Sequence, residues 1–430
     1  MPSSRVFFLL ALTTVLVVAG VVVPDLGRLA LLLDGAILAA FAVDYLRVRR
    51  AALVAERRWP RLLVQGAEAE VTVELASGDA RSRRVRLRDT LNPALAVAPR
   101  RTELELPARG RLAWSYRIRP RRRGEHLSGP LVARILGPWR LAWTQRQLLA
   151  GEPRRVYPQV RWDGKVGHLL VLAHRRSLGR HPQRIRGLGR EPYALREYLP
   201  GDPPNKIHWK ATARHGRLIT REETWERGAR LIILLDCARG MSGLAGTRSK
   251  LDHALAAALA LTRVAVSRGD RVSFAAFSDR IERTLRIHGG HRALHAAYGN
   301  VYDLEARLAE PAFDVAAETA TQFESRRSTA VLFTSVVDLA AAELLREAVL
   351  RLERRHRPIL INLEDPELVG LAVGEPATPE EVFAKVSALE ILLANRRLGT
   401  RLRHAGIRVV NTSADRLALE TLEAYLAMFR

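Results

Sequence analysis

The stretch Leu231-Ile-Ile-Leu-Leu-Asp-Cys-Ala-Arg-Gly-Met241 places five large apolar residues directly before an aspartate. Such a short apolar run is typical of a strand buried on both faces of a sheet. Similar runs then alternate with helical stretches to the end of the chain. We expect strands at 231–235, 272–277, 281–285, 330–334, 359–363 and 407–410, and helices at 249–267, within 291–325, and at 339–354, 379–403 and 414–429. This alternation predicts a doubly wound α/β domain over residues 231–430. Ligands on such sheets bind at the carboxyl ends of strands, the position of Asp236.

Residues 62–160, upstream of this domain, have a different periodicity. Segments such as Glu70-Val-Thr-Val-Glu-Leu75 alternate apolar and polar side chains, and turn residues such as Asn92-Pro93 interrupt them. Alternation of this kind predicts half-buried antiparallel strands, here a small sandwich of the immunoglobulin-like kind. We interpret the basic run Arg119–Arg123 as a solvated loop rather than a phosphate or lipid site.

The first 46 residues predict a transmembrane helical hairpin. Val6–Val23 is an uncharged run of 18 residues, and the apolar run Leu29–Leu46 follows after a five-residue connection. Eighteen helical residues extend about 27 Å, close to the thickness of one hydrocarbon core. The basic juxtamembrane segment 47–61 follows the second run, so the positive-inside rule places both termini in the cytoplasm. A secretory signal peptide is the alternative, and the second apolar run argues against it.

Two acidic residues belong to the second apolar run or its end. Asp34 is open to two interpretations, a proton or substrate path or a position near the membrane interface, and we favour the interface. We expect Asp44 to reach the interface at the other end of the helix.

The 430 residues include 69 Lys or Arg and 45 Asp or Glu, a formal net charge of +24. Residues 1–230 carry +23 of this charge and residues 231–430 carry +1. Such asymmetry is typical of nucleic-acid binding or of a segment that faces anionic lipid. The apolar N-terminus favours lipid, so we expect no nucleic-acid partner. The single cysteine, Cys237, excludes a disulfide scaffold and a cysteine-based zinc module.

Residues 161–230 form a loop-rich junction that contains Leu195-Arg-Glu-Tyr-Leu-Pro-Gly-Asp202 and Ile207-His-Trp-Lys-Ala-Thr-Ala213. This density of charged and aromatic residues suits an ion-paired clamp, an interface or an active site. Asp202 and His208 suggest acid and base roles, but no nucleophile motif or glycine-rich cradle accompanies them. We therefore favour a structural or partner-binding role. The motif residues are Arg196, Tyr198, Pro200, Gly201, Asp202, Ile207, Trp209 and Lys210.

The order of these features resembles a known bacterial family. An apolar hairpin, a β region, the junction motif and then Leu234-Leu-Asp236 opening an α/β domain are similar to MoxR-associated proteins that carry "domain of unknown function 58". Arg119–Glu125, Gly129-Pro130, Gly137-Pro138 and Ser267–Phe274 extend the resemblance over nearly the whole chain. It implies a membrane-anchored multidomain α+β chain whose C-terminal part is similar to a von Willebrand factor A domain.

The resemblance also implies where a metal would bind. Von Willebrand A domains commonly hold a divalent cation through Asp-x-Ser-x-Ser after the first strand, with a Thr and a further Asp from later loops. Here Asp236 remains, but Ala238 and Gly240 stand at the serine positions, and Ser335 stands where the later aspartate is expected. Asp338 lies three residues beyond. We therefore expect no metal and no cofactor, and we expect Asp236 to cap the following turn or helix or to pair with an arginine.

Three histidines and the single cysteine are the other candidate site residues. His288, His291 and His295 have suggestive spacing, but a structural zinc needs four ligands and no further ligand is evident. Cys237 lacks an assigned base, so we interpret it as a small buried residue.

These features together predict a non-enzymatic scaffold or adaptor in the bacterial inner membrane. The resemblance implies a MoxR-type AAA+ ATPase as partner, in the assembly or maturation of an envelope or metalloprotein complex. The bilayer with its anionic headgroups is the other expected partner. The alternative is a metal-dependent or hydrolytic enzyme that uses Asp202, His208 and Asp236.

Overall fold

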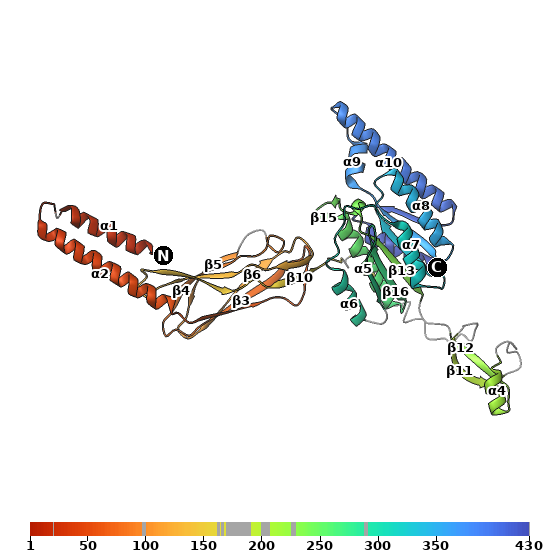
Figure 1. Cartoon of the computed structure of the whole chain (residues 1–430), viewed down its shortest axis with the longest axis horizontal. Helices are drawn as coiled ribbons and strands as arrows, with labels where there is room; N and C mark the ends of the chain where they lie inside the picture. The colour runs from red at the N-terminus through yellow and green to blue at the C-terminus, as the bar shows by residue number, and fades with distance from the viewer. Residues whose placement is uncertain are drawn as a thin grey trace. The chain divides into compact units, whose positions relative to one another are not determined.

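A computed structural model describes residues 1–19, 21–96, 100–160, 164, 167–168, 191–198, 207–224, 229–287 and 291–429 (Figure 1). It divides into two compact units, Met1–Gln159 and Val160–Arg430, and each is described by itself. The prediction of a mixed α/β chain with an apolar N-terminal helix is confirmed.

Two apolar helices open the first unit, α1 (Ser4–Ala19) and α2 (Pro24–Arg49). Pro24 is the first residue of α2, a position where its missing N–H costs nothing. Among the described residues, α2 is the one helix long and apolar enough to cross a membrane, while α1 is a shorter apolar helix. Both boundaries correct the sequence prediction, because α1 ends before Val23 and α2 continues past residue 46. Thr13 Oγ1 donates to Asp34 Oδ1 at 2.5 Å, so the neighbouring helix satisfies this carboxylate.

The strands that follow form a domain of mainly antiparallel sheets, in which β2 and β10 are the one parallel pair among the described strands, here called the β-domain (residues 53–157). Its strands are β1 (Leu53–Arg58), β2 (Leu63–Val64), β3 (Ala69–Ser77), β4 (Arg83–Asp89), β5 (Arg100–Leu106), β6 (Arg111–Ile118), β7 (Gly124–Leu127), β8 (Leu131–Leu136), β9 (Trp143–Leu149) and β10 (Pro153–Tyr157). They pair in the orders β1-β3-β6, β5-β4-β8-β9 and β2-β10-β7. Alternate side chains such as Val73, Leu75, Val85 and Leu87 meet in the core between the first two sheets.

The position of β1 corrects the interpretation of residues 47–61 as a basic juxtamembrane segment. Arg57, one of its arginines, is buried in the β-domain rather than exposed toward lipid. Its Nη2 donates to Asp89 Oδ1 at 2.7 Å, and Tyr116 donates to the other oxygen of Asp89 at 2.5 Å. Arg57 Nη1 also donates to Ser128 Oγ at 3.0 Å. Burial raises the pKa of Asp89, and these two donors oppose that shift because they favour the charged form.

Asp44 attaches α2 to the β-domain. It is fully buried, and its carboxylate accepts hydrogen bonds from the backbone N–H groups of Trp139, Leu141 and Ala142 at 2.9–3.0 Å. A Cβ on Gly137 would lie 2.2 Å from Asp44 Oδ2, so only glycine permits this approach. The expectation that Asp44 lies at the membrane interface is therefore corrected, because backbone amides of the β8–β9 turn bind it instead.

The described part of the junction is a small hairpin. β11 (Glu191–Glu197) pairs antiparallel with β12 (Ile219–Thr224), and α4 (Trp209–His215) lies between them in sequence. His208 Nδ1 accepts from the N–H of Ala211 and caps α4, whose end is marked by Gly216 in the left-handed conformation (φ 66°).

A six-stranded sheet of order β17-β16-β13-β18-β19-β20 forms the core of the C-terminal domain (residues 229–429). Its strands are β13 (Arg230–Asp236), β16 (Arg271–Phe277), β17 (Ile281–Ile287), β18 (Thr329–Thr334), β19 (Arg357–Leu363) and β20 (Arg408–Thr412). β17 is antiparallel to β16, and the other pairs are parallel. In chain order this is the doubly wound arrangement 3-2-1-4-5-6, which reverses beside β13.

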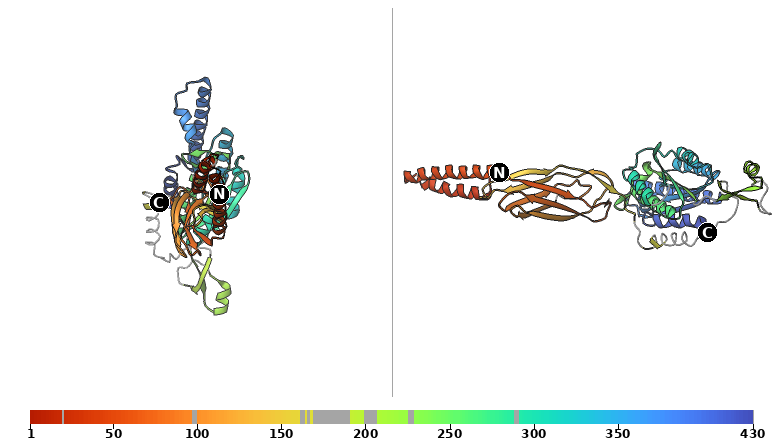
Figure 2. Two further views of the ribbon diagram at one scale, coloured as in Figure 1. Left: turned by 90° about the vertical axis from the view of Figure 1, so that its left-hand side faces the viewer. Right: turned by 90° about the horizontal axis from the view of Figure 1, so that it is seen from below.

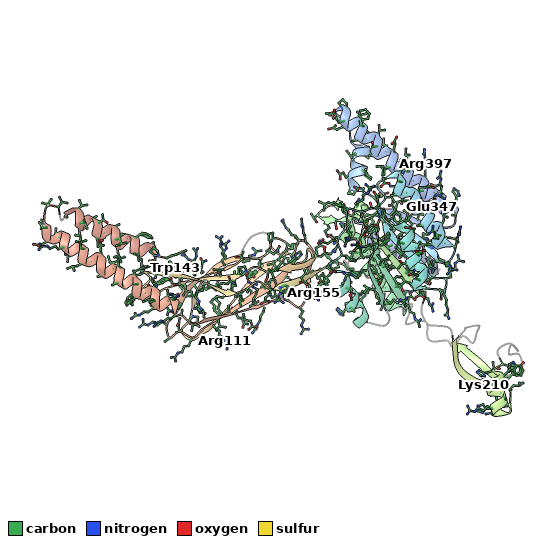
Figure 3. All side chains as sticks on the ribbon, in the orientation of Figure 1. Arg111, Trp143, Arg155, Lys210, Glu347 and Arg397 are labelled. Atoms are coloured by element: carbon green, nitrogen blue, oxygen red, sulfur yellow. The ribbon has the colours of Figure 1, made fainter. Side chains whose placement is uncertain are left out.

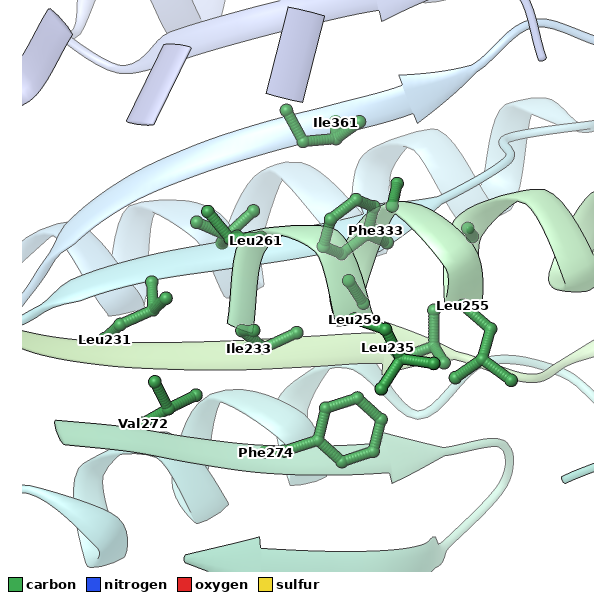
Figure 4. Close-up of a cluster of buried hydrophobic side chains, with 14 of the residues drawn as sticks. Leu231, Ile233, Leu235, Leu255, Leu259, Leu261, Val272, Phe274, Phe333 and Ile361 are labelled. Atoms are coloured by element: carbon green, nitrogen blue, oxygen red, sulfur yellow. The ribbon is translucent and has the colours of Figure 1, made fainter. Parts of the chain in front are cut away.

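Helices cover both faces of this sheet. They are α5 (Lys250–Ser267), α6 (His291–Val301), α7 (Phe313–Phe323), α8 (Leu339–Glu353), α9 (Pro366–Val373), α10 (Pro379–His404) and α11 (Leu417–Leu426). Leu231, Ile233 and Leu235 of β13 pack with α5, as Figure 4 shows, and belong to the same cluster as the buried residues of α11. Ile232 and Leu234 pack with α7 and α8 on the other face. Burial of both faces explains why β13 is apolar from Leu231 to Leu235. The sequence prediction did not include α9.

Candidate functional site

The candidate site lies at the carboxyl ends of β13, β18 and β19, where the strand order of the sheet reverses. Asp236 is the last residue of β13, and Thr334 is the last residue of β18. Parallel strands expose their carboxyl ends at one edge, so residues distant in sequence meet there. We call this group of residues, Asp236, Lys250, Thr334, Ser335 and Asp365, the edge cluster.

Both carboxylate oxygens of Asp236 have partners inside the protein. Oδ1 accepts from the N–H of Ala238 at 2.7 Å, and Oδ2 accepts from Thr334 Oγ1 at 2.6 Å. Burial raises the pKa of Asp236 to about 6, although both hydrogen bonds and the ammonium of Lys250 favour the charged form. Asp236 therefore caps the turn after β13, one of the roles expected for it.

Lys250 provides a buried positive charge in the edge cluster. It is the first residue of α5 and is 1% exposed. Its Nζ donates to Asp365 Oδ2 at 2.5 Å and to Ser335 Oγ at 3.2 Å. Sequence reasoning missed both Lys250 and Asp365. The available signals were a capping box at Ser249 and Asp252, which fixes the start of α5, and the rarity of lysine in a chain with only five.

The loop after β13 closes over this edge. A Cβ on Gly240 would lie 2.3 Å from the carbonyl oxygen of Ser335, so no larger residue fits there without a backbone shift. A Cβ on Gly243 would lie 3.0 Å from Cε of Lys250. Glycine at these positions lets the loop pack tightly against the residues after β18 and against Lys250.

The edge cluster does not suit a divalent cation. Ala238 and Gly240 have no side-chain oxygens, and the two oxygens of Asp236 already accept hydrogen bonds. Lys250 adds a positive charge beside Ser335 and Asp365 that would repel Mg²⁺. In the described ranges, no group of three or more His, Cys, Asp or Glu side chains is placed to hold a metal ion.

Asp338, the other residue considered for the metal site, caps a helix. Its Oδ1 accepts from the N–H of Ala341 at the start of α8. Its Oδ2 pairs with Arg239 at 2.7 Å, and Arg239 also pairs with Glu310 at 3.0 Å. Asp338 is thus bound to the loop after β13 through an arginine.

Part of the junction motif can be located. Tyr198 donates its N–H to the carbonyl of Leu218, and Ile207 forms a β-bridge with Thr220, so both belong to the hairpin. Trp209 is 65% exposed on α4, beside the exposed Lys210 (Figure 3). Arg196 lies in β11, but its side chain falls outside the description, as do Pro200, Gly201 and Asp202 entirely.

The remaining candidates separate into buried and exposed residues. Cys237 is fully buried, and its N–H donates to the carbonyl of Phe277. His295 is exposed on α6, whereas His288 and the side chain of His291 lie outside the described part.

Comparison with known proteins gives one family match. Residues 194–384 match a family model described as "Protein of unknown function DUF58", a range that contains most of the hairpin and the edge cluster. No curated protein matches the chain in sequence.

Similar solved structures include the crystal structure of the SpRpn10 VWA domain, which is 12% identical with a TM-score of 0.27 and covers 45% of this chain and 93% of that one. The CARDB domain of PF1109 from Pyrococcus furiosus is 13% identical with a TM-score of 0.19, and covers 25% of this chain and 88% of that one. Proximal thread matrix protein 1 from the mussel byssus is 12% identical with a TM-score of 0.24, and the match covers 47% of this chain and 45% of that one.

Proposed function

We propose that this chain is a non-enzymatic scaffold of the bacterial inner membrane, anchored by α1 and α2, whose C-terminal domain binds another protein. The partner is a MoxR-type AAA+ ATPase, and the process is the assembly or maturation of an envelope or metalloprotein complex. The resemblance to MoxR-associated proteins supports the choice of partner.

An exposed apolar face on the C-terminal domain carries the proposal. Figures 1 and 2 show α9 and α10 extending away from the sheet. Val382, Val386, Leu389 and Leu393 form a stripe along α10 and are 40–49% exposed, and Phe383 beside them is 74% exposed. On α9, Val373 is 77% exposed. We call this surface the α9–α10 face. Contiguous exposed apolar side chains of this kind are typical of protein-binding surfaces.

The base of α9 is joined to the edge cluster. Asp365 caps α9 through the N–H of Glu367 with one carboxylate oxygen, and accepts from Lys250 with the other. A partner bound to the α9–α10 face would therefore contact a helix whose first turn is held by the ion pair between Asp365 and the buried Lys250. The weak net charge of residues 231–430 suits a surface that binds through apolar contacts.

Affinity capture of the detergent-solubilised full-length protein, with and without ATP analogues, tests the proposal. We expect mass spectrometry to identify an AAA+ ATPase, whose recovery falls at least about tenfold when Phe383 and Val386 are both changed to Ser. Leu339 and Leu344 on α8 are 55% and 54% exposed, so Leu339→Ser with Leu344→Ser is the matched control and should not alter recovery. Failure to recover an AAA+ ATPase under any nucleotide condition would contradict the proposal.

The enzyme alternative has its own test. A purified protein that hydrolyses members of a substrate panel, and loses that activity on Asp236→Ala while retaining its fold, would replace the scaffold proposal with a catalytic one.

A further inference from the structure

We propose that a pocket of about 420 Å³ in the first unit binds the phosphate group of an anionic phospholipid. The pocket lies between the N-terminal segment of the chain and the four-stranded sheet β5-β4-β8-β9. Five arginines line it: Arg5, Arg84, Arg86, Arg134 and Arg140. The inference rests on the membrane anchoring in the proposed function, but it concerns a different domain from the α9–α10 face.

The charge of this pocket is strongly unbalanced. Its lining contains no Asp or Glu. Glu103 lies outside it and pairs with Arg86 at 2.9 Å and with Arg84 at 3.6 Å. In the part of the chain that the structure describes, no second carboxylate forms an ion pair with any of the five arginines. Such a pocket attracts an anion, and guanidinium groups bind phosphate oxygens in a bidentate geometry.

The backbone fixes the pocket at the end of the apolar helices. Pro2 forms an antiparallel bridge with Ala142, and the N–H of Ser3 donates to the carbonyl of Leu141 at 2.8 Å. Ser3 Oγ donates to the carbonyl of Arg140 at 2.6 Å, and α1 begins at the next residue. Asp44 binds the same 139–142 turn from the end of α2. Both helix ends and the pocket wall therefore meet at one turn.

This position corresponds to the headgroup layer when α1 and α2 lie in a bilayer. Trp143 lines the pocket where the helices meet the β-domain (Figure 3), and the guanidinium of Arg86 stacks 4.6 Å from its ring. Trp139 on the same turn is 42% exposed and lies 4.6 Å from the guanidinium of Arg47. Tryptophan concentrates at the membrane interface, and arginine beside it binds anionic headgroups. We therefore assign the phosphate to a lipid rather than to a soluble anion.

A second hollow extends the basic surface along the same sheet. It has a volume of about 630 Å³, and Arg86 and Arg134 line both hollows. Arg88 and Arg101 line the second one together with Thr90 and Thr102, and its one carboxylate, Glu103, is paired with Arg84 and Arg86. Hydroxyl and guanidinium donors beyond the phosphate suit a headgroup with its own hydroxyls, as in phosphatidylglycerol.

Calorimetry on the full-length protein in a zwitterionic detergent tests the site, with short-chain phosphatidylglycerol as the probe. We expect saturable binding, at least tenfold weaker with short-chain phosphatidylcholine. The triple variant Arg84→Gln, Arg134→Gln, Arg140→Gln should lower the affinity at least about tenfold. The control is a second triple variant, Arg61→Gln, Arg111→Gln, Arg122→Gln, which removes the same charge from exposed positions outside the pocket. It should change the affinity for phosphatidylglycerol less than about twofold.

The other outcomes overturn the proposal. Equal binding by both triple variants would show a general charge effect rather than a site. Inorganic phosphate that binds as tightly as the lipid would assign the pocket to a soluble anion. Arg140→Gln alone is the second variant if the triple variant fails to fold, because this exposed side chain is not in a strand, and it should still weaken binding severalfold. Lipid binding is measured without a bilayer, and the scaffold proposal is tested separately by ATPase capture. Failure of the scaffold proposal is therefore distinguishable from failure of the lipid site.

Discussion

Lys250 and Asp236 show how a single residue can change the chemistry of a strand end. In a site that suits Mg²⁺, several oxygens converge on a cation from solution. Here the chain supplies its own cation, because the ammonium of Lys250 binds Asp365 and Ser335. Lys250 is buried and Asp365 is partly exposed, so removal of Asp365 would leave a buried ammonium without its carboxylate.

The pKa of Asp236 makes the stability of the C-terminal domain depend on pH. Its pKa is about 6 in the folded state and about 3.9 in an unfolded chain, so the folded state retains the proton between these values. The contribution of Asp236 is fully present below pH 4 and is lost as the pH rises to 6, a loss of the order of 3 kcal/mol. Amide hydrogen exchange of β13 in the full-length protein, corrected for intrinsic rates, should show this decrease.

Two variants check the cause. Asp236→Asn should remove the decrease in the free energy of unfolding between pH 4 and 6. The stability of this variant relative to the unchanged protein should therefore rise with pH. Lys250→Met should destabilise the domain by roughly 3–5 kcal/mol at pH 7, because Asp365 and Asp236 lose their cation. A pH profile that is the same in all three proteins would refute the assignment to Asp236.

At the scale of elements, close packing of loops brings polar side chains together with the backbone of a neighbouring loop or turn. The loop after β13 approaches the loop after β18 so closely that Gly240 touches the carbonyl of Ser335. In the β-domain, Gly137 lets the carboxylate of Asp44 approach the β8–β9 turn in the same way. Each glycine is required because the neighbouring group already occupies the position of a Cβ.

Restoring the two serines of the metal motif should therefore fail. Gly240→Ser forces the loop away from Ser335 and should cost about 1–3 kcal/mol or more. Ala238→Ser with Gly240→Ser should still show no heat of Mg²⁺ binding in calorimetry, because Lys250 remains. Gly299→Ser on α6, where no atom lies within 4 Å of the added Cβ, is the control and should leave stability nearly unchanged. Mg²⁺ binding that disappears on Asp236→Ala would contradict this interpretation of the edge cluster.

At the scale of the whole molecule, the charge and the apolar helices predict a topology. The α1–α2 connection contains the highly exposed Val22, and most of the basic charge lies after α2. If both termini are cytoplasmic, residue 22 lies outside the membrane and the β-domain lies inside.

Cysteine labelling of cells can test this topology, because the natural Cys237 is fully buried. A membrane-impermeant maleimide should label Val22→Cys in intact spheroplasts and Arg111→Cys only after permeabilisation. A cleaved signal peptide would reverse the result, with residue 111 labelled in intact spheroplasts and residue 22 absent from the mature protein.

The succession of strands and helices could be read from the sequence, because the burial of each element sets its own local periodicity. Leu231–Leu235 is apolar throughout since both faces of β13 are covered, and the apolar runs at 6–23 and 29–46 mark α1 and α2 to within a few residues. Asp236 could also be selected, because it directly follows an apolar run at the carboxyl end of a strand, where ligands bind on such sheets.

The residues that surround Asp236 in the edge cluster could not be identified from the sequence. Lys250 and Asp365 are 115 residues apart, and no local pattern relates the start of α5 to the end of β19. From the sequence alone, Asp44 is expected at the membrane interface. In the structure, its carboxylate accepts hydrogen bonds from backbone amides of the β8–β9 turn, 95–98 residues later in the chain. The sequence alone determined most of the strands and helices of the C-terminal domain and the excess of positive charge in residues 1–230. Only the tertiary structure decided which polar groups share a buried site, because long-range packing selects the partner of each buried charge.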